Sequence, residues 1–151
     1  MNRSVLAVVL MTVVVVGTSQ ACSNGPSTAD LSELFCSSSV VFKGTSVSAT
    51  SSQYYNEQDQ VVVGGSYTYN VTTFYKNAAN AGPEARVFFS ATGEAEASDC
   101  HYGAYSGATS SVDLVFATGS RFLSMASCRD HIPGDCVPEE FWSTLPDVSC
   151  D

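Results

Sequence analysis

Basic residues are scarce in this sequence. Its 151 residues include 6 Lys and Arg against 15 Asp and Glu, which gives a net charge of −9 and a pI near 4.4. Such a chain lacks the positive surface that attracts nucleic acid, heparin or anionic lipid, so we expect no nucleic-acid partner. Histidine is scarce as well. His101 and His131 lie in no motif that places either beside a nucleophile, and we therefore expect a protein that is not an enzyme and has no cofactor of its own.

Long apolar runs are also scarce. The one run present, Val5–Val16, is too short to span a bilayer as a stable anchor, so we expect no membrane span. Arg3 precedes it, and Ser19 and Ala21 occupy the −3 and −1 positions of a signal-peptidase site. We expect residues 1–21 to be a signal peptide and the product to be secreted to the extracellular space. Cleavage after Ser19 is the alternative.

Removal of this leader leaves one domain by length, residues 22–151. The leader carries a single charge, so these 130 residues have a net charge of −10. They contain Asn70-Val71-Thr72, a sequon that predicts N-glycosylation at Asn70.

Cysteine, by contrast, is plentiful. The six are Cys22, Cys36, Cys100, Cys128, Cys136 and Cys150. An even count in a secreted chain indicates three disulfides, for which fifteen pairings exist, and the absence of a CxxC argues against a structural zinc site. Cys22 would be the first residue after cleavage. A free α-amine, a carbonyl oxygen and a disulfide sulfur would then lie within one residue, and the amine and carbonyl together can chelate a metal.

Residue patterns predict a helix at each end of residues 22–151 and strands between them. Ser27 or Thr28 can cap a helix that ends at Cys36, and Pro138 can begin the closing helix. Gly44 marks a bend or bulge in the first strand. The expected strands are 40–49, 65–75, 85–92, 112–117 and 122–126, and the expected loops include 51–60 and 93–107.

Five short strands between two helices predict a mostly β fold. We expect a five-stranded OB-like Greek-key barrel with a short N-terminal helix and a C-terminal helix, stapled by disulfides. A β-sandwich is the rival architecture, but it usually shows about seven strands.

Several stretches, taken in order, resemble one known family. CSNGPSTADLSELFC is similar to an opening cysteine followed by a helix and Phe-Cys, and SSSVVFKGTSVSA and YTYNVTTFYKN are similar to the family's first two strands. ASDCHYG resembles its loop cysteine, VDLVFATGSRFLSMASC its strand, turn, strand and cysteine, and the Trp142 region its last helix. The family is that of netrin-like domains, and the resemblance is greatest to the N-terminal domain of the tissue inhibitors of metalloproteinases.

The resemblance implies a disulfide pairing. It matches Cys22–Cys100 and Cys36–Cys150 to two bonds of the family. The sequence departs from the vertebrate inhibitors at Asn24, where they carry a cysteine bonded to the one that matches Cys128. Because that partner is missing and Cys136 is extra, we expect Cys128–Cys136 as the third bond.

The resemblance also implies a function, the inhibition of secreted zinc metalloproteinases. The Cys22 amine and carbonyl would occupy the open position on the enzyme's catalytic zinc and displace its water. The inhibitory ridge would comprise Cys22, Ser23, Asn24, Gly25, Ala97, Ser98, Asp99 and Cys100. The alternative is a non-inhibitory extracellular netrin-like module that binds a partner or the extracellular matrix.

The remaining candidates have simpler interpretations. We expect His101 to be solvated or capping, and His131 and Asp130 to form a surface pair. The acids Asp130, Asp135, Glu139 and Glu140 match no EF-hand loop, so they indicate a solvated acidic face. Tyrosines in expected loops are candidate contacts for a partner: Tyr54, Tyr55, Tyr102 and Tyr105. Tyr67 and Tyr69 should pack inside the fold.

We predict that the mature protein begins at Cys22. The intact mass of the secreted material should equal that of residues 22–151 with three disulfides, plus any glycan. A start two or more residues earlier would contradict metal binding by Cys22, because an acylated nitrogen is a poor zinc ligand.

Overall fold

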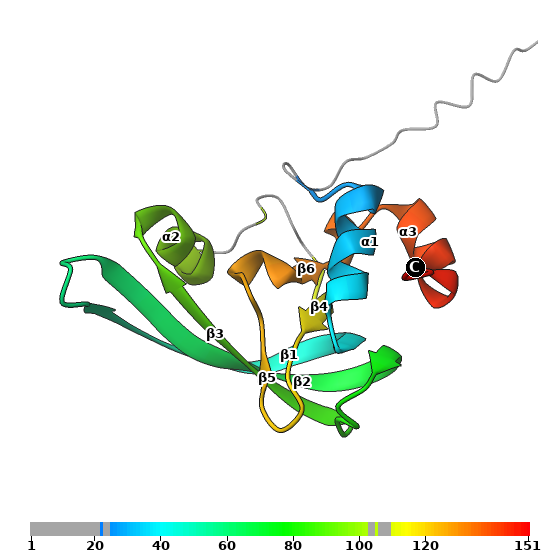
Figure 1. Cartoon of the computed structure of the whole chain (residues 1–151), viewed down its shortest axis with the longest axis horizontal. Helices are drawn as coiled ribbons and strands as arrows, with labels where there is room; N and C mark the ends of the chain where they lie inside the picture. The colour runs from blue at the N-terminus through cyan, green and yellow to red at the C-terminus, as the bar shows by residue number, and fades with distance from the viewer. Residues whose placement is uncertain (1–21, 23–24, 103–104, 106–109) are drawn as a thin grey trace, which may run out of the picture.

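The computed structural model describes residues 22, 25–102, 105 and 110–151, in which one six-stranded sheet carries three α-helices (Figure 1). The strands are β1 (Val40–Tyr55), β2 (Val61–Asn77), β3 (Glu84–Thr92), β4 (Val112–Ala117), β5 (Leu123–Ser124) and β6 (His131–Pro133). The α-helices are α1 (Thr28–Ser37), α2 (Glu94–Tyr102) and α3 (Glu139–Thr144), and the 3-10 turns are η1 (Cys128–Asp130), η2 (Gly134–Cys136) and η3 (Leu145–Asp147). None of the helices in these residues is long and apolar enough to cross a membrane.

The strands are arranged in the order β5-β3-β2-β1-β4-β6. Neighbouring strands are antiparallel except for β3 and β5, which are parallel. The mostly β class and the helices before and after the strands are confirmed. The sheet has six strands where five were expected, because residues 131–133 pair with β4. Three residues are too few to show an alternating pattern in a sequence.

Two segments that were expected to be loops form regular structure. Residues 51–55 continue β1 and pair with residues 61–65, so the β1–β2 hairpin projects well beyond the body of the sheet (Figure 1). Gly65 permits this pairing, because a Cβ there would lie 1.9 Å from the Thr50 carbonyl oxygen. The other segment contains α2. Its first turn holds Glu94 and Glu96, whose charges favour the positive end of a helix.

The body of the sheet is buried on both faces. Along β1, Val40 and Phe42 belong to one core cluster and Val41 to the other, as expected for a strand whose successive side chains point in opposite directions. The first cluster also contains Cys100 of α2 and Cys128 of η1. The second contains apolar residues of α1, β4, β6 and α3, so these two helices and α2 cover opposite faces. We call them the α2 face and the α1 face.

Helix α1 begins where its sequence predicts. Ser27 forms a capping box with Asp30, in which the Asp30 amide donates to the Ser27 hydroxyl at 3.2 Å and the Ser27 amide donates to the Asp30 carboxylate at 3.1 Å. At the other end, the Lys76 ammonium donates to the carbonyl oxygens of Phe35 and Cys36 at 3.1 and 3.3 Å. A cation at the negative end of the helix stabilises it and fixes α1 against β2.

The β1–β2 pairing is irregular at three places, which bends the sheet. Register shifts fall between Val41 and Phe42, between Lys43 and Gly44, and between Ser46 and Ser48. The expectation of a bulge at Gly44 is therefore confirmed. A Cβ at this glycine would lie 2.9 Å from the Asn70 carbonyl oxygen, so the two strands approach too closely there for a larger residue. Bulges increase twist and curl the sheet around the α2 face.

Two ionisable side chains lie where β4 pairs with β6, Asp113 on β4 and His131 on β6. Burial raises the pKa of Asp113 to about 6 and lowers the pKa of His131 to about 4. The His131 ring packs edge-on against Tyr67, with ring centroids 4.5 Å apart. The expected surface pair of His131 and Asp130 is therefore wrong, because β6 carries the histidine into the sheet and the Asp130 carboxylate accepts the Ser127 amide at 3.0 Å.

We predict that Asp113→Asn makes the protein more stable at pH 7, by about 2 kcal/mol. The folded state binds the Asp113 proton more tightly than the unfolded chain does, so this group's contribution to stability is lost as pH rises through about 6. His131 has the opposite sign, because protonation between pH 6.5 and about 4 favours the unfolded chain. Urea unfolding from pH 4 to 8 measures both effects. In the variant, stability should rise with pH throughout the acid range, and parallel profiles for the two proteins would contradict the assignment.

Candidate functional site

Cys22 is held in the core of the α1 face. Its sulfur is bonded to Cys136 of η2, and the residue is only 7% exposed. Gly25 passes close to the same turn, since a Cβ on it would lie 3.1 Å from the Cys136 carbonyl oxygen. The residue that would begin the mature chain is therefore fixed to the body of the protein. Ser23 and Asn24 fall outside the described residues.

The other half of the expected ridge lies on α2. Ala97 and Cys100 face the core and are 5% and 6% exposed, whereas Ser98 is exposed. The Asp99 carboxylate forms an ion pair with Arg129, with 2.9 Å between Oδ2 and Nε. Asp99 therefore holds α2 against η1. The carboxylate thus has a structural partner within the protein.

The disulfides correct two expected pairings. Cys36–Cys150 is confirmed. Cys22–Cys100 and Cys128–Cys136 are wrong, because the structure pairs Cys22 with Cys136 and Cys100 with Cys128. The reason lies in the two faces of the sheet. Cys128 and Cys136 are close in sequence, but β6 lies between them and they belong to different core clusters. Cys128 shares its cluster with Cys100, and Cys136 shares its cluster with Cys22.

The structure therefore brings the ridge together only in part. Ala97, Ser98, Asp99 and Cys100 share one helix on the α2 face, while Cys22 belongs to the core of the α1 face. No disulfide joins the two groups among the described residues. Any surface made from both would depend on the packing of the whole sheet for its shape.

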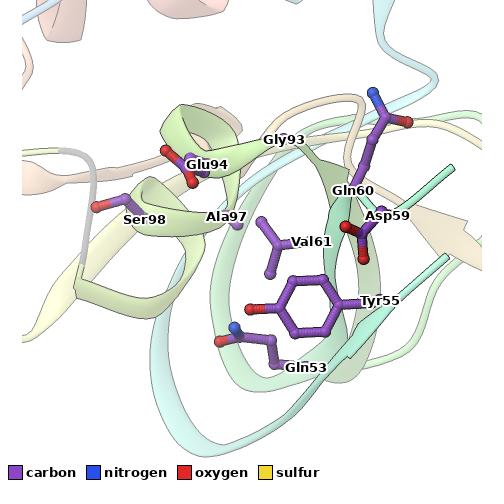
Figure 2. Close-up of a pocket in the computed structure, with 9 residues that line it drawn as sticks. All are labelled: Gln53, Tyr55, Asp59, Gln60, Val61, Gly93, Glu94, Ala97 and Ser98. Carbon is purple, nitrogen blue, oxygen red and sulfur yellow. The ribbon is translucent and has the colours of Figure 1, made fainter.

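A cavity of about 530 Å³ lies between α2 and the end of the β1–β2 hairpin (Figure 2). It is lined by Gln53, Tyr55, Asp59, Gln60, Val61, Gly93, Glu94, Ala97 and Ser98. We call it the hairpin pocket. Two of its residues, Ala97 and Ser98, were expected in the ridge. Four of the hairpin residues opposite them, Gln53, Tyr55, Asp59 and Gln60, fall in the segment that the sequence predicts as a loop, and Tyr55 is one of the tyrosines expected to contact a partner.

The hairpin pocket is aromatic and acidic. Tyr55 is 67% exposed, and its ring lies along the pocket across from α2, with the Gln53 amide beside it (Figure 2). Asp59 and Glu94 contribute two carboxylates, and none of the lining residues is basic. Neither carboxylate has an ion pair among the described residues. The pocket thus suits a partner that presents a basic or amide-bearing side chain.

The other candidates have varied surroundings. The Tyr105 hydroxyl donates to the Arg129 carbonyl oxygen at 2.7 Å, and burial raises the pKa of Tyr105 to about 12. Tyr69 is fully buried, as expected for a packing residue. Asn70 is exposed on β2, where a glycan would be accommodated. The side chains of His101 and Tyr102 lie outside the described part of the structure.

The described residues contain no group of three or more His, Cys, Asp or Glu side chains that could hold a metal ion. Asp130 is buried in the capping box of η1, so the expectation that it belongs to a solvated acidic face is wrong. Glu139 and Glu140 are exposed in the first turn of α3, and the Thr28 hydroxyl donates to the Glu140 carboxylate at 3.0 Å. The contact joins α1 to α3.

The chain matches no protein-family model and no curated protein.

We predict that tryptic digestion without reduction separates the cysteine-containing peptides into two linked pairs. Cleavage after Lys43, Arg86, Arg121 and Arg129 leaves residues 22–43 joined to 130–151, through Cys22–Cys136 and Cys36–Cys150. Residues 87–121 should be joined separately to 122–129, through Cys100–Cys128. Mass spectrometry distinguishes this from the pairing that the family resemblance implies, which would link all four peptides in one product. Finding that single product would show that the pairing described here is wrong.

Proposed function

We propose that the chain is a secreted netrin-like protein that inhibits a zinc metalloproteinase through Cys22. The observation that carries this proposal is the Cys22–Cys136 bond, which ties the expected first residue of the mature chain to η2. A chain end is normally mobile, and here it would be rigid. The curled sheet between two helices supports the OB-like barrel that we propose as its fold.

The chemistry of inhibition would reside in the backbone of Cys22. A catalytic zinc in a metalloproteinase has three protein ligands and one position open to water. A neutral α-amine and the adjacent carbonyl oxygen are suited to that position, and a reference pKa of about 7.7–8.0 makes loss of the amine proton inexpensive near neutral pH. Because the disulfide orders Cys22 before the enzyme is met, less entropy is lost on binding.

The hairpin pocket would supply a second contact. Ala97 and Ser98 line it from α2, and the exposed ring of Tyr55 lines it from β1. Exposed tyrosines are typical of protein interfaces, since a rigid aromatic side chain gives a large contact area at low entropic cost. Cys22 and α2 are anchored by different disulfides. A substitution that removes the contact at Cys22 should therefore leave the contact at the hairpin pocket in place, and the reverse.

The hairpin pocket also favours a second candidate function, that of an extracellular binding module. An aromatic pocket with two carboxylates, Asp59 and Glu94, can recognise a basic partner without any metal chemistry. In this case the Cys22–Cys136 bond would only fasten the end of the chain. The three disulfides suit the oxidising extracellular environment under either function.

We predict that one alanine added before Cys22 abolishes inhibition, with a loss on the order of 100-fold or more, equal to about 2.7 kcal/mol. The extension converts the amine into an amide and places bulk at the metal. The measurement is peptide hydrolysis by a panel of matrix-type zinc proteinases. The matched control carries the same alanine after Asp151, which is exposed, and should inhibit like the unmodified protein.

Two outcomes would contradict this function. Equal inhibition by both extended proteins would show that the Cys22 amine does not bind zinc. If residues 22–151 at micromolar concentration inhibit none of the proteinases, the binding module becomes the better conclusion. Tyr55→Ser then tests that module directly, because it should weaken binding to a basic partner while leaving the circular dichroism unchanged.

A further inference from the structure

A second cavity, of about 450 Å³, lies away from the hairpin pocket. It is formed by the turn between β2 and β3, the first half of β3 and the loop between β4 and β5. In Figure 1 these segments meet at the lower edge of the view, whereas α2 lies at the upper left. The lining residues are 79–82, Glu84, Ala85, Arg86, Phe88 and 120–123. We call it the arginine pocket.

Two exposed phenylalanines stand in this pocket, each beside an arginine. Phe88 and Phe122 are 37% and 67% exposed and meet edge to face, with ring centroids 6.4 Å apart. The Arg86 guanidinium lies 5.0 Å from the Phe88 ring, and the Arg121 guanidinium lies 5.7 Å from the Phe122 ring. The result is a continuous surface of two rings and two cations.

The loop that carries Phe122 is held in place. Thr118 and Ser124 form a β-bridge across its base, with both backbone hydrogen bonds at 2.9 Å. Gly119 has a φ of +122°, and a Cβ on it would lie 1.9 Å from the Phe122 carbonyl oxygen. This backbone turn therefore requires glycine. The turn holds the Phe122 ring exposed to solvent in a fixed backbone conformation. Exposing an apolar ring costs free energy that burying it in the core would avoid.

The charges of this pocket differ from those of the rest of the described chain. The other basic side chains are already in use: Lys76 caps α1, Arg129 pairs with Asp99, and Lys43 lies over the Trp142 ring. Arg86 donates through Nε to the Ser66 hydroxyl, and Arg121 has no ion pair among the described residues. Glu84 is the one acid in the pocket lining. Two guanidinium groups against one carboxylate make it a positive spot on a chain of net charge −9.

We propose that the arginine pocket binds an acidic peptide segment of a partner protein, in which carboxylates flank a bulky apolar side chain. Arginine forms paired hydrogen bonds with carboxylates, and its position over a phenylalanine fixes the direction in which it can donate. The apolar side chain would pack on Phe88 and Phe122. A long polyanion fits less well, because the net charge of the chain repels it outside this spot.

The proposal does not rest on the proposed inhibition. The arginine pocket shares no lining residue with the hairpin pocket, and Cys22 takes no part in it. Asn70 pairs with Glu84 across β2 and β3, so a glycan there would project from the same side of the sheet as the pocket. The experiment therefore uses residues 22–151 with Asn70→Gln.

The test is fluorescence anisotropy with a short labelled peptide in which glutamates flank a leucine. We expect saturable binding that weakens with salt, and at least about fivefold weaker binding for Arg121→Gln and for Phe122→Ser. Both residues are exposed, and circular dichroism checks the fold. The matched controls are Lys43→Gln, with the same change of charge, and Val47→Ser, another exposed apolar residue. Both should bind like the parent protein.

Several results would overturn the proposal. These are no binding of the acidic peptide, equal binding of a peptide with lysines in place of the glutamates, or unchanged binding by Arg121→Gln and Phe122→Ser. Tighter binding of a heparin oligosaccharide that Arg121→Gln weakens would identify a sulfated glycan instead. Sedimentation that shows a dimer, lost in Arg121→Gln, would identify a second copy of this chain as the occupant. None of these measurements involves a proteinase, so the proposed inhibition stands or fails separately.

Discussion

The whole arrangement depends on a strand that is buried on both faces. Val40, Val41 and Phe42 at the start of β1 are each fully buried, and the strand pairs with β2 on one side and β4 on the other. Successive side chains of β1 point to opposite faces of the sheet and divide the core into two clusters. The described α-helices therefore pack on one face or the other. Removing apolar side chains of this kind from a core costs about 2–5 kcal/mol each, which is a large part of a small domain's stability.

The same division decides how the cysteines pair. Cys22 and Cys136 belong to the cluster of the α1 face, and Cys100 and Cys128 to that of the α2 face. The loop-entropy model gives about 5 kcal/mol for the first bond, which closes a separation of 114 residues, and about 3.5 kcal/mol for the second, which closes 28. Each face thus carries its own covalent tie. Cys22 and helix α2 are therefore fixed by different disulfides, and none of the three disulfides joins them directly.

Much of this fold could be predicted from local sequence patterns. The helix cap at Ser27, the strand at residues 85–92 and the bulge at Gly44 follow from short-range signals, and each lies where the sequence predicts it. The far end of the hairpin could not be recognised this way. Residues 51–55 are exposed on both sides and are held by backbone pairing with β2, which leaves no apolar pattern to read.

The disulfide pairing and the hairpin pocket could not be predicted in this way, because both depend on contacts between residues that are far apart in the sequence. Spacing permits Cys128 to pair with Cys136, and only the passage of β6 between the two faces prevents it. The burial of His131 has the same origin, since a histidine beside an aspartate in a turn-rich segment gives no sign of a strand. Tyr55 was recognisable as an exposed contact, but the pocket around it exists only because α2 forms opposite the hairpin.

Strand β3 relates the two pockets to each other. It begins at Glu84 in the arginine pocket and ends next to Gly93 in the hairpin pocket. Gly93 follows Arg86 by seven residues, which at about 3.3 Å each places it roughly 23 Å away along the strand, about three Debye lengths at physiological salt. The carboxylates of one pocket are therefore screened from the guanidinium groups of the other, and each pocket keeps its own electrostatic character. If both proposals hold, a strand of this length would let one small domain bind a basic partner group near one end and an acidic one near the other, without either displacing the other.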